Sequence, residues 1–222
     1  GMTHEGMGVG RIDGLAVFVE GAVTGETVEI KIIKVNKNYA VGKLLNVIEP
    51  SPGRTAPFCG IYGKCGGCSL QHMDYETQLD FKTGVVRDSI GRIAGLSGIE
   101  VRRTIGMDDP MGYRNKAQYP VALVSGDVAV GFYAKRSHSV VPNEGCGIQN
   151  DISARAAAIV RDFIKRNNIS VYDETTGKGV VRHVVVRTAF KTGEAMVILV
   201  INADGIPAKE KLVEMITKEI PA

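Results

Sequence analysis

The sequence predicts an α+β protein with two domains: a small N-terminal β-barrel, then a larger part with an antiparallel sheet and a cysteine-rich loop. Short β-type runs separated by glycine turns fill the chain before Pro50. Amphipathic helical stretches and further strands follow, and all 4 cysteines lie in this second part. We expect the first domain to span residues 1–52 and the second to span residues 53–222.

The N-terminal runs Leu15–Val19, Thr27–Val35 and Tyr39–Ile48 have the composition of strands, and the second alternates apolar and charged residues. Several short strands with glycine turns favour a small barrel of the oligonucleotide-binding (OB) kind. The glycines of residues 6–10 fit a turn better than a cofactor loop, because no strand precedes them and no helix follows. Four lysines fit either a phosphate-tracking face or solvated strand edges: Lys31, Lys34, Lys37 and Lys43.

Beyond a linker at residues 50–53, Asp74 can cap a helix that runs from Tyr75 to about Ile93. A short strand is expected at 101–105, and a hairpin at 122–133 turns around Ser125-Gly126-Asp127.

A second helix, capped by Asn150 or Asp151, extends to about Asn167. Two strands at 180–190 and 194–202 are apolar on both faces, which favours a central position in their sheet. A last helix opens at Pro207.

The cysteines show a spacing typical of a metal site. Five residues separate Cys59 from Cys65, two separate Cys65 from Cys68, and Cys146 follows far along the chain. A disulfide framework fits poorly, because no signal peptide precedes it and the chain is long. Structural zinc usually shows two short paired knuckles, and Cys146 has no nearby partner. A three-plus-one arrangement suits an iron–sulfur cluster best, with Cys146 tying the hairpin to the cysteine loop.

The formal net charge is +3 and the pI is about 8.6, which permits a nucleic-acid partner without requiring one. No apolar run reaches the roughly 18 residues of a membrane span. We expect a monomer in the reducing cytoplasm, with no membrane partner.

One segment combines hydrogen-bond donors with an aromatic ring: Tyr113, Arg114, Asn115 and Lys116. Arg and Lys suit phosphates, Asn suits base edges and Tyr stacks on bases, so an RNA contact is one interpretation and a polar edge strand is the other. Lys135 and Arg136 cluster with His138 at the turn after the hairpin, and we include both cations in the RNA-contact set.

These motifs resemble a known family. The pattern Cys59-x5-Cys65-Gly-Gly-Cys68, the run from Gly112 to Lys116 and Cys146-x-x-Gln149 are similar to the RNA uracil-5-methyltransferases, in particular those acting on 23S ribosomal RNA. The opening, from Glu5-Gly6-x-Gly8 to Ser51-Pro52-x-Arg54, resembles the TRAM domain of that family.

The resemblance implies an RNA-binding TRAM barrel, a central domain whose Cys59, Cys65, Cys68 and Cys146 hold a [4Fe–4S] cluster, and a C-terminal Rossmann-like domain. That last domain would bind S-adenosylmethionine and supply a catalytic cysteine that adds to C6 of uracil. We expect it to be absent from this chain, because all four cysteines match cluster ligands and no strand–glycine loop–helix unit follows. The first TRAM strand is also expected to be missing or shortened.

No catalytic residue is therefore assigned, and the chain alone is predicted to be inactive. As the N-terminal fragment of a 23S rRNA uracil-5-methyltransferase, it would hold RNA. The alternative is a stand-alone iron–sulfur or zinc module that binds RNA or senses redox state.

Overall fold

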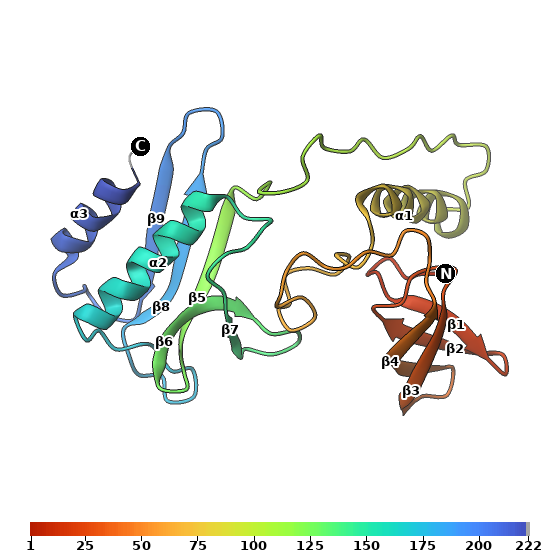
Figure 1. Ribbon diagram of the computed structural model, residues 1–222, viewed down its shortest axis with the longest axis horizontal. Helices are drawn as coiled ribbons and strands as arrows, with labels where there is room; N and C mark the ends of the chain where they lie inside the picture. The colour runs from red at the N-terminus through yellow and green to blue at the C-terminus, as the bar shows by residue number, and fades with distance from the viewer. Residues whose placement is uncertain (221–222) are drawn as a thin grey trace. The chain divides into compact units, whose positions relative to one another are not determined.

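The computed structural model describes residues 1–220, which form two compact units (Figure 1). The N-terminal unit consists of Gly1–Gly60 and Cys68–Asp108, and the C-terminal unit consists of Ile61–Gly67 and the chain from Asp109 onward. Each unit contains its own sheet and at least one helix, which confirms the predicted α+β class. No helix in this described part is long and apolar enough to cross a membrane.

The N-terminal unit is built on four strands: β1 (Gly8–Ile12), β2 (Leu15–Glu20), β3 (Thr27–Val35) and β4 (Tyr39–Glu49). Their spatial order is β1-β2-β4-β3, with β2 and β4 parallel and the other pairs antiparallel. The end strands β1 and β3 do not pair with each other in this sheet, so the sheet is open. The four strands therefore do not close into the small OB-like barrel that we expected.

The small core of this sheet explains why it stays open. Its buried apolar residues are few: Val17, Val19, Ala22 and Ala40. The far half of β3 extends beyond them, so Ile33 is 60% exposed and Val35 is 68% exposed. With so little apolar surface to enclose, burial provides little drive for β3 to curl round and meet β1.

The first strand is present rather than missing. Gly8 and Gly10 lie within β1, which pairs antiparallel with β2. Asp13 and Gly14 join the two strands, both with positive φ (49° and 83°). Asp-Gly is a dipeptide that suits such a hairpin turn, so the turn lies at Asp13 and Gly14 and not at residues 6–10, where we expected one.

Helix α1 (Tyr75–Asp88) begins where Asp74 caps it, with Oδ1 accepting a hydrogen bond of 2.7 Å from the Thr77 amide. The chain continues as a π-helical turn, η1 (Ser89–Ile93), so the helical stretch ends where the sequence predicted. The strand expected at residues 101–105 does not form.

The linker at residues 50–53 does not separate the compact units, which differs from the expected division after residue 52. The Asp74 amide donates to the Gly53 carbonyl at 2.9 Å, and Arg54 pairs with Met73 in an isolated β-bridge. The Arg54 guanidinium also reaches back to Glu26, at the turn before β3. These contacts hold α1 and the four strands β1 to β4 in one unit.

The C-terminal unit contains β5 (Lys116–Val124), β6 (Asp127–Tyr133), β7 (Val140–Pro142), β8 (Val181–Thr188) and β9 (Ala195–Ile201). All pairs are antiparallel, in the order β7-β6-β5-β8-β9, which confirms the predicted antiparallel sheet. The β8–β9 hairpin was expected to be central, but β9 is an edge strand.

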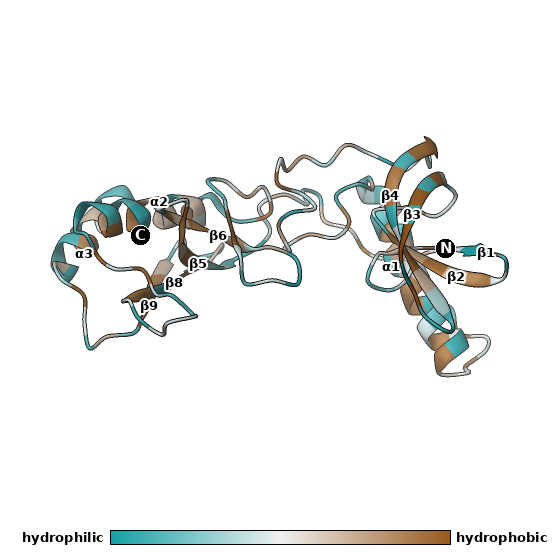
Figure 2. Cartoon of the chain, turned by 90° about the horizontal axis from the view of Figure 1, so that it is seen from below, coloured by the Kyte–Doolittle hydropathy of each residue, from teal (hydrophilic) through white to brown (hydrophobic). Residues whose placement is uncertain are grey.

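Two helices, α2 (Asp151–Arg166) and α3 (Lys209–Glu219), complete the C-terminal unit. α2 packs on β5, β6 and β8, and α3 packs on α2 (Figure 1). Their apolar residues share one core with one face of the sheet, where Phe163, Ile164 and Val184 are completely buried. Figure 2 shows how apolar β9 is, although only one of its faces meets this core.

Candidate nucleic-acid interface

The sheet of the C-terminal unit has a second face, opposite the core, which we call the outer face. Alternate residues of β5, β8 and β9 point to it, because successive side chains of a strand point to opposite sides. Three rows of side chains cross it from β5 through β8 to β9: Lys116–Arg187–Met196, Gln118–Val185–Ile198 and Pro120–His183–Val200.

The outer face is accessible within the C-terminal unit. Met196 is 58% exposed, and Ile198 and Val200 are each 37% exposed. Both described helices of this unit belong to the opposite, core side. The outer face is therefore open, with Lys116 and Arg187 at one end and His183 at the other.

Lys116 and Arg187 lie directly opposite each other at one end of the outer face, which we call its cationic end. Both side chains are exposed, and neither makes a hydrogen bond or ion pair with a described residue. Like charges directly opposite each other in a sheet repel, so this arrangement lowers stability unless an anion lies between them.

Three further residues that we predicted to contact RNA directly precede Lys116 in the chain: Tyr113, Arg114 and Asn115. The backbone of residues 112–115 is fixed: the Arg114 amide donates to the Ile148 carbonyl at 2.9 Å, and the Asn115 carbonyl accepts from the Thr188 amide at 2.8 Å. The side chains of Tyr113, Arg114 and Asn115 are exposed. The segment is thus a tethered backbone with outward donors, as an RNA contact requires.

Lys135 and Arg136 lie at the opposite end, in the turn after β6. The loop Ile61–Gly67 pairs with this turn through a bridge between Cys65 and Ala134, and the Gly66 amide donates to the Tyr133 carbonyl at 2.9 Å. A Cβ on Gly66 would lie 3.2 Å from that carbonyl oxygen, so glycine allows the close pairing.

The loop, the turn and the outer face line a shallow, open hollow of about 610 Å³, which we call the basic hollow. Its polar and charged lining comes from the sheet and the turn: Gln118, Tyr133, Lys135, Arg136, Ser137, His138 and His183. Two of the predicted contact residues therefore share one site, whereas Tyr113 to Lys116 do not line it.

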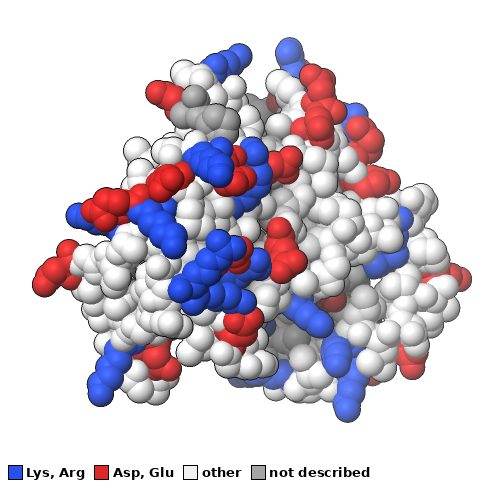
Figure 3. Space-filling model, turned by 60° about the vertical axis from the view of Figure 1, so that its left-hand side comes forward, with Lys and Arg blue, Asp and Glu red and all other residues white. Residues whose placement is uncertain are grey.

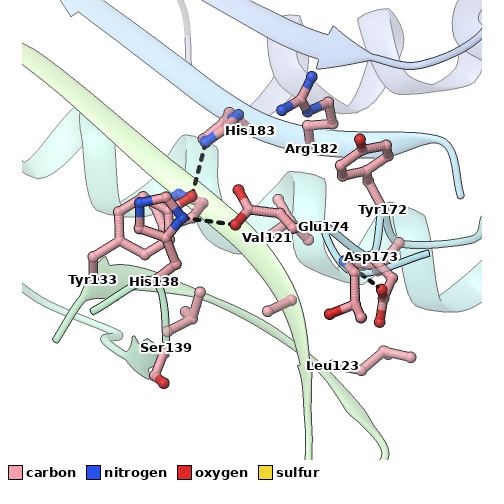
Figure 4. A pocket seen from close by; sticks show the side chains of 15 residues that line it. Val121, Leu123, Tyr133, His138, Ser139, Tyr172, Asp173, Glu174, Arg182 and His183 are labelled. Carbon is pink, nitrogen blue, oxygen red and sulfur yellow. Dashed lines mark hydrogen bonds and ion pairs between the residues drawn. The ribbon is translucent and has the colours of Figure 1, made fainter. Parts of the chain in front are cut away.

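A second hollow of about 370 Å³ adjoins it and shares Tyr133, His138 and His183 with it; we call it the tyrosine hollow (Figure 4). The Tyr133 hydroxyl lies 3.3 Å from His183 Nε2, and the Tyr133 ring stacks on His138 with centroids 5.0 Å apart. On the other side, the Arg182 guanidinium lies 4.3 Å from the centre of the Tyr172 ring.

Electrostatics fix the charge states of the groups in the tyrosine hollow. The hydrogen bond from His138 Nδ1, 2.7 Å long, lowers the pKa of Glu174. Burial lowers the pKa of His183, and Arg182 lowers it further. Burial and the Glu174 carboxylate raise the pKa of Tyr133. At neutral pH the hollow therefore presents an ionised Glu174, a neutral His183 and a protonated Tyr133.

The cysteines do not form the predicted cofactor site. None forms a disulfide, and residues 1–220 contain no group of three or more His, Cys, Asp or Glu side chains that could hold a metal ion. The expected [4Fe–4S] cluster is therefore wrong. Locally, Cys65 Sγ accepts a hydrogen bond of 3.3 Å from the Gly67 amide.

Several residues of the interface were not selected from the sequence: Tyr133, Tyr172, Glu174, Arg182, His183 and Arg187. Arg182, His183 and Arg187 stand out in the sequence only as polar interruptions of an apolar strand. Their alternation within β8 was the available signal, because it places His183 and Arg187 on the same side of the strand. Glu174 and Tyr172 lie in a loop, where sequence spacing gives no such signal.

Charge over the protein is mixed. Figure 3 shows Lys and Arg interspersed with Asp and Glu on the face it displays, with no continuous surface of one sign. This fits the small formal net charge of +3. Any anion-binding region must therefore be local, as the cationic end of the outer face is.

The chain is similar to a known domain family and to known proteins. Residues 1–45 match the TRAM domain family. A protein of Clostridium tetani (strain Massachusetts / E88) named an uncharacterized RNA methyltransferase is 47% identical over 99% of this chain and 48% of its own length. A protein of Clostridium acetobutylicum with the same description is 48% identical over 97% of this chain and 47% of its own length.

The fold is also known from a crystal structure, that of Pyrococcus abyssi tRNA (uracil-54, C5)-methyltransferase in complex with S-adenosyl-L-homocysteine. It matches with a TM-score of 0.69 and 22% identity, over 95% of this chain and 47% of that chain. The chain thus has a TRAM domain, is similar along its whole length to proteins named RNA methyltransferases, and spans about half the length of the curated relatives it matches.

Proposed function

We propose that this chain is the RNA-recognition part of a uracil-5-methyltransferase that acts, as a monomer, on 23S ribosomal RNA. The observation that carries the proposal is the cationic pair Lys116 and Arg187 on the open outer face. Two uncompensated like charges held face to face are explained by an anionic ligand, and the TRAM domain and the relatives' names point to RNA.

The outer face supplies the contacts that single-stranded RNA needs. Lys116 and Arg187 bind phosphates at one end, and Lys135 and Arg136 bind them at the basic hollow. Between the two ends, Gln118 offers hydrogen bonds to a base edge and Tyr133 offers an aromatic ring. The predicted contacts Tyr113, Arg114 and Asn115 extend this path beyond the first row.

Methyl transfer is a property of the whole protein, and we assign no catalytic residue to this chain. The Pyrococcus abyssi enzyme is in complex with S-adenosyl-L-homocysteine, the molecule that S-adenosylmethionine becomes after it gives up its methyl group. We therefore take S-adenosylmethionine as the methyl donor and C5 of uracil as the acceptor. The role of the outer face and the basic hollow is to bind and orient the RNA strand.

Binding of a fluorescein-labelled single-stranded fragment of 23S rRNA, followed by anisotropy, tests the proposal. We compare the unaltered chain with the double variant Lys116→Gln/Arg187→Gln. The control is Lys209→Gln/Lys211→Gln, which removes the same charge from two exposed positions in the first turn of α3. Each lost phosphate contact should weaken binding about tenfold, since a hydrogen bond to a charged group contributes roughly 1.5 kcal/mol or more.

The salt dependence separates phosphate contacts from other losses. For a single strand, the slope of log K against log salt should become less steep by about 1.4 in the double variant, roughly 0.7 for each phosphate. The α3 control should keep the slope of the unaltered chain. Equal slopes in all three proteins would refute the proposed contacts, and tighter binding of tRNA than of the 23S fragment would replace ribosomal RNA by tRNA as the substrate.

A further inference from the structure

The tyrosine hollow contains features that phosphate binding does not use. Figure 4 shows Glu174 between two pairs of side chains: the stacked rings of Tyr133 and His138, and the cation–π pair of Tyr172 and Arg182. An ionised carboxylate repels phosphate, so this hollow does not hold the RNA backbone. Its volume of about 370 Å³ lies within the range of small-molecule sites, roughly 300–1,000 Å³.

The carboxylate is held in place by a rigid turn. Asp173 Oδ1 accepts hydrogen bonds of 2.8 Å from the amides of both Thr175 and Thr176. The Asp173 amide donates to the Lys178 carbonyl at 2.8 Å, which closes the turn. Glu174 is thus presented from a fixed backbone, and His138 fixes one of its oxygens. Such preorganisation reduces the entropy lost when a ligand binds.

Arg182 adds a fixed cation. Its guanidinium lies over Tyr172 and makes no hydrogen bond or ion pair with a described residue, and its Nε is buried without a partner. A guanidinium held by stacking presents a planar surface and outward donors, which suit the face and the carbonyl groups of a base.

The edges of the four RNA bases differ in how they meet a carboxylate. Guanine places two donors side by side, N1–H and the N2 amino group, which a carboxylate accepts together. Uracil flanks its single donor with carbonyl oxygens, and in adenine and cytosine the amino donor adjoins an acceptor nitrogen. Each of these three bases would therefore place an acceptor atom next to a carboxylate oxygen of Glu174, and two acceptors repel each other.

We propose that the tyrosine hollow binds one unstacked guanine of the RNA strand, with Glu174 accepting its N1–H and N2 amino hydrogens and Arg182 facing its carbonyl side. This inference rests on the proposed function, because it assumes that RNA lies on the outer face. The shared wall of Tyr133, His138 and His183 places the phosphate of that nucleotide beside Lys135 and Arg136 in the basic hollow.

The test uses three labelled RNA nonamers: uridine throughout, uridine with one central guanosine, and uridine with one central inosine. Inosine differs from guanosine only by lacking the N2 amino group. Anisotropy titrations of the unaltered chain should show the guanosine nonamer binding about tenfold more tightly than the inosine nonamer, as expected for loss of one hydrogen bond to a carboxylate.

Two variants assign this preference to the hollow. Glu174→Gln keeps the size of the side chain but replaces one acceptor by a donor, so it should bind guanosine and inosine nonamers equally. Glu219→Gln removes the same charge from an exposed position in α3 and should keep the preference. Affinity for the uridine nonamer should stay the same or increase slightly in Glu174→Gln.

The outcomes separate this inference from the proposed function. If the unaltered chain binds none of the nonamers, both are overturned. If it binds all three with one affinity, the guanine site is overturned and RNA binding stands. That comparison needs no variant, so a misfolded substitution cannot obscure it. A guanosine preference that survives in Glu174→Gln also overturns the inference.

Discussion

The buried ion pair between Glu26 and Arg54 should be the most sensitive polar interaction of the N-terminal unit. The Glu26 side chain has no exposed surface, and its carboxylate accepts hydrogen bonds from the Val23 amide at 2.8 Å and the Ser51 amide at 3.3 Å. Arg54 donates to it through Nε and through Nη2, the latter at 2.7 Å, and Nη2 also donates to the Gly21 carbonyl at 2.7 Å.

Replacing Arg54 by Met keeps most of the volume but leaves a buried carboxylate without its cation. Breaking a buried pair in this way costs about 3–5 kcal/mol, a large part of the roughly 5–15 kcal/mol that stabilises a domain. The carbonyl of Gly53, next to Arg54, accepts a hydrogen bond from the Asp74 amide at the start of α1. We therefore expect the contact between α1 and the sheet to loosen at the same time.

Hydrogen exchange of peptides from β2 and β4, measured at increasing urea concentrations, gives the free energy of unfolding of the N-terminal unit separately from that of the C-terminal unit. The double variant Glu26→Gln/Arg54→Met removes the buried charge and should recover part of the lost stability. A loss below about 1 kcal/mol in Arg54→Met would refute our account of the pair, since a buried unpaired charge cannot cost so little.

The pH dependence of the same pair has a definite sign. Burial raises the pKa of Glu26, but the hydrogen bonds from Arg54, Val23 and Ser51 outweigh burial, so the pKa lies below its ordinary value of 4.5. The stability from this pair is therefore complete above pH 4.5 and is lost as pH falls through the lower, folded-state pKa. The Arg54→Met variant should lose this acid-side dependence.

Two further substitutions test local features of the fold. Asp74→Ala should destabilise α1 by about 1 kcal/mol in thermal unfolding, whereas Asp74→Asn, which keeps a capping oxygen, should cost much less. Gly131→Ala places a Cβ 2.0 Å from the Val141 carbonyl oxygen, so it should separate β7 from β6 and cost roughly 1–3 kcal/mol. Gly205→Ala, which meets nothing within 4 Å, should leave the melting temperature of the C-terminal unit unchanged.

The helices and strands followed from the sequence wherever a cap or a period was strong. Asn150 caps α2 as predicted, with Oδ1 accepting from the Ile152 amide at 2.9 Å, and the β8–β9 hairpin forms. What failed depended on distant partners. The apolar positions Met196, Ile198 and Val200 indicated a buried strand, but they lie on an open face, because which face a helix covers is a tertiary choice.

The candidate site was less accessible to sequence reasoning. Lys135 and Arg136 were selected because they cluster at one turn, whereas Glu174 and Arg182 join that region only through the folding of the sheet. The cysteine spacing was over-interpreted. A short spacing permits convergence of thiols, but Cys65 instead belongs to a loop that pairs with Ala134 and shapes the basic hollow.

Ultraviolet crosslinking of a single-stranded 23S rRNA fragment to the unaltered chain, with the attached peptides identified by mass spectrometry, tests the central claim most directly. Our account predicts crosslinks on peptides that contain β5, β8 and the turn at Lys135 and Arg136, competed away by rising salt. Crosslinks confined to α2 and α3 would place RNA on the opposite side of the sheet and contradict the account.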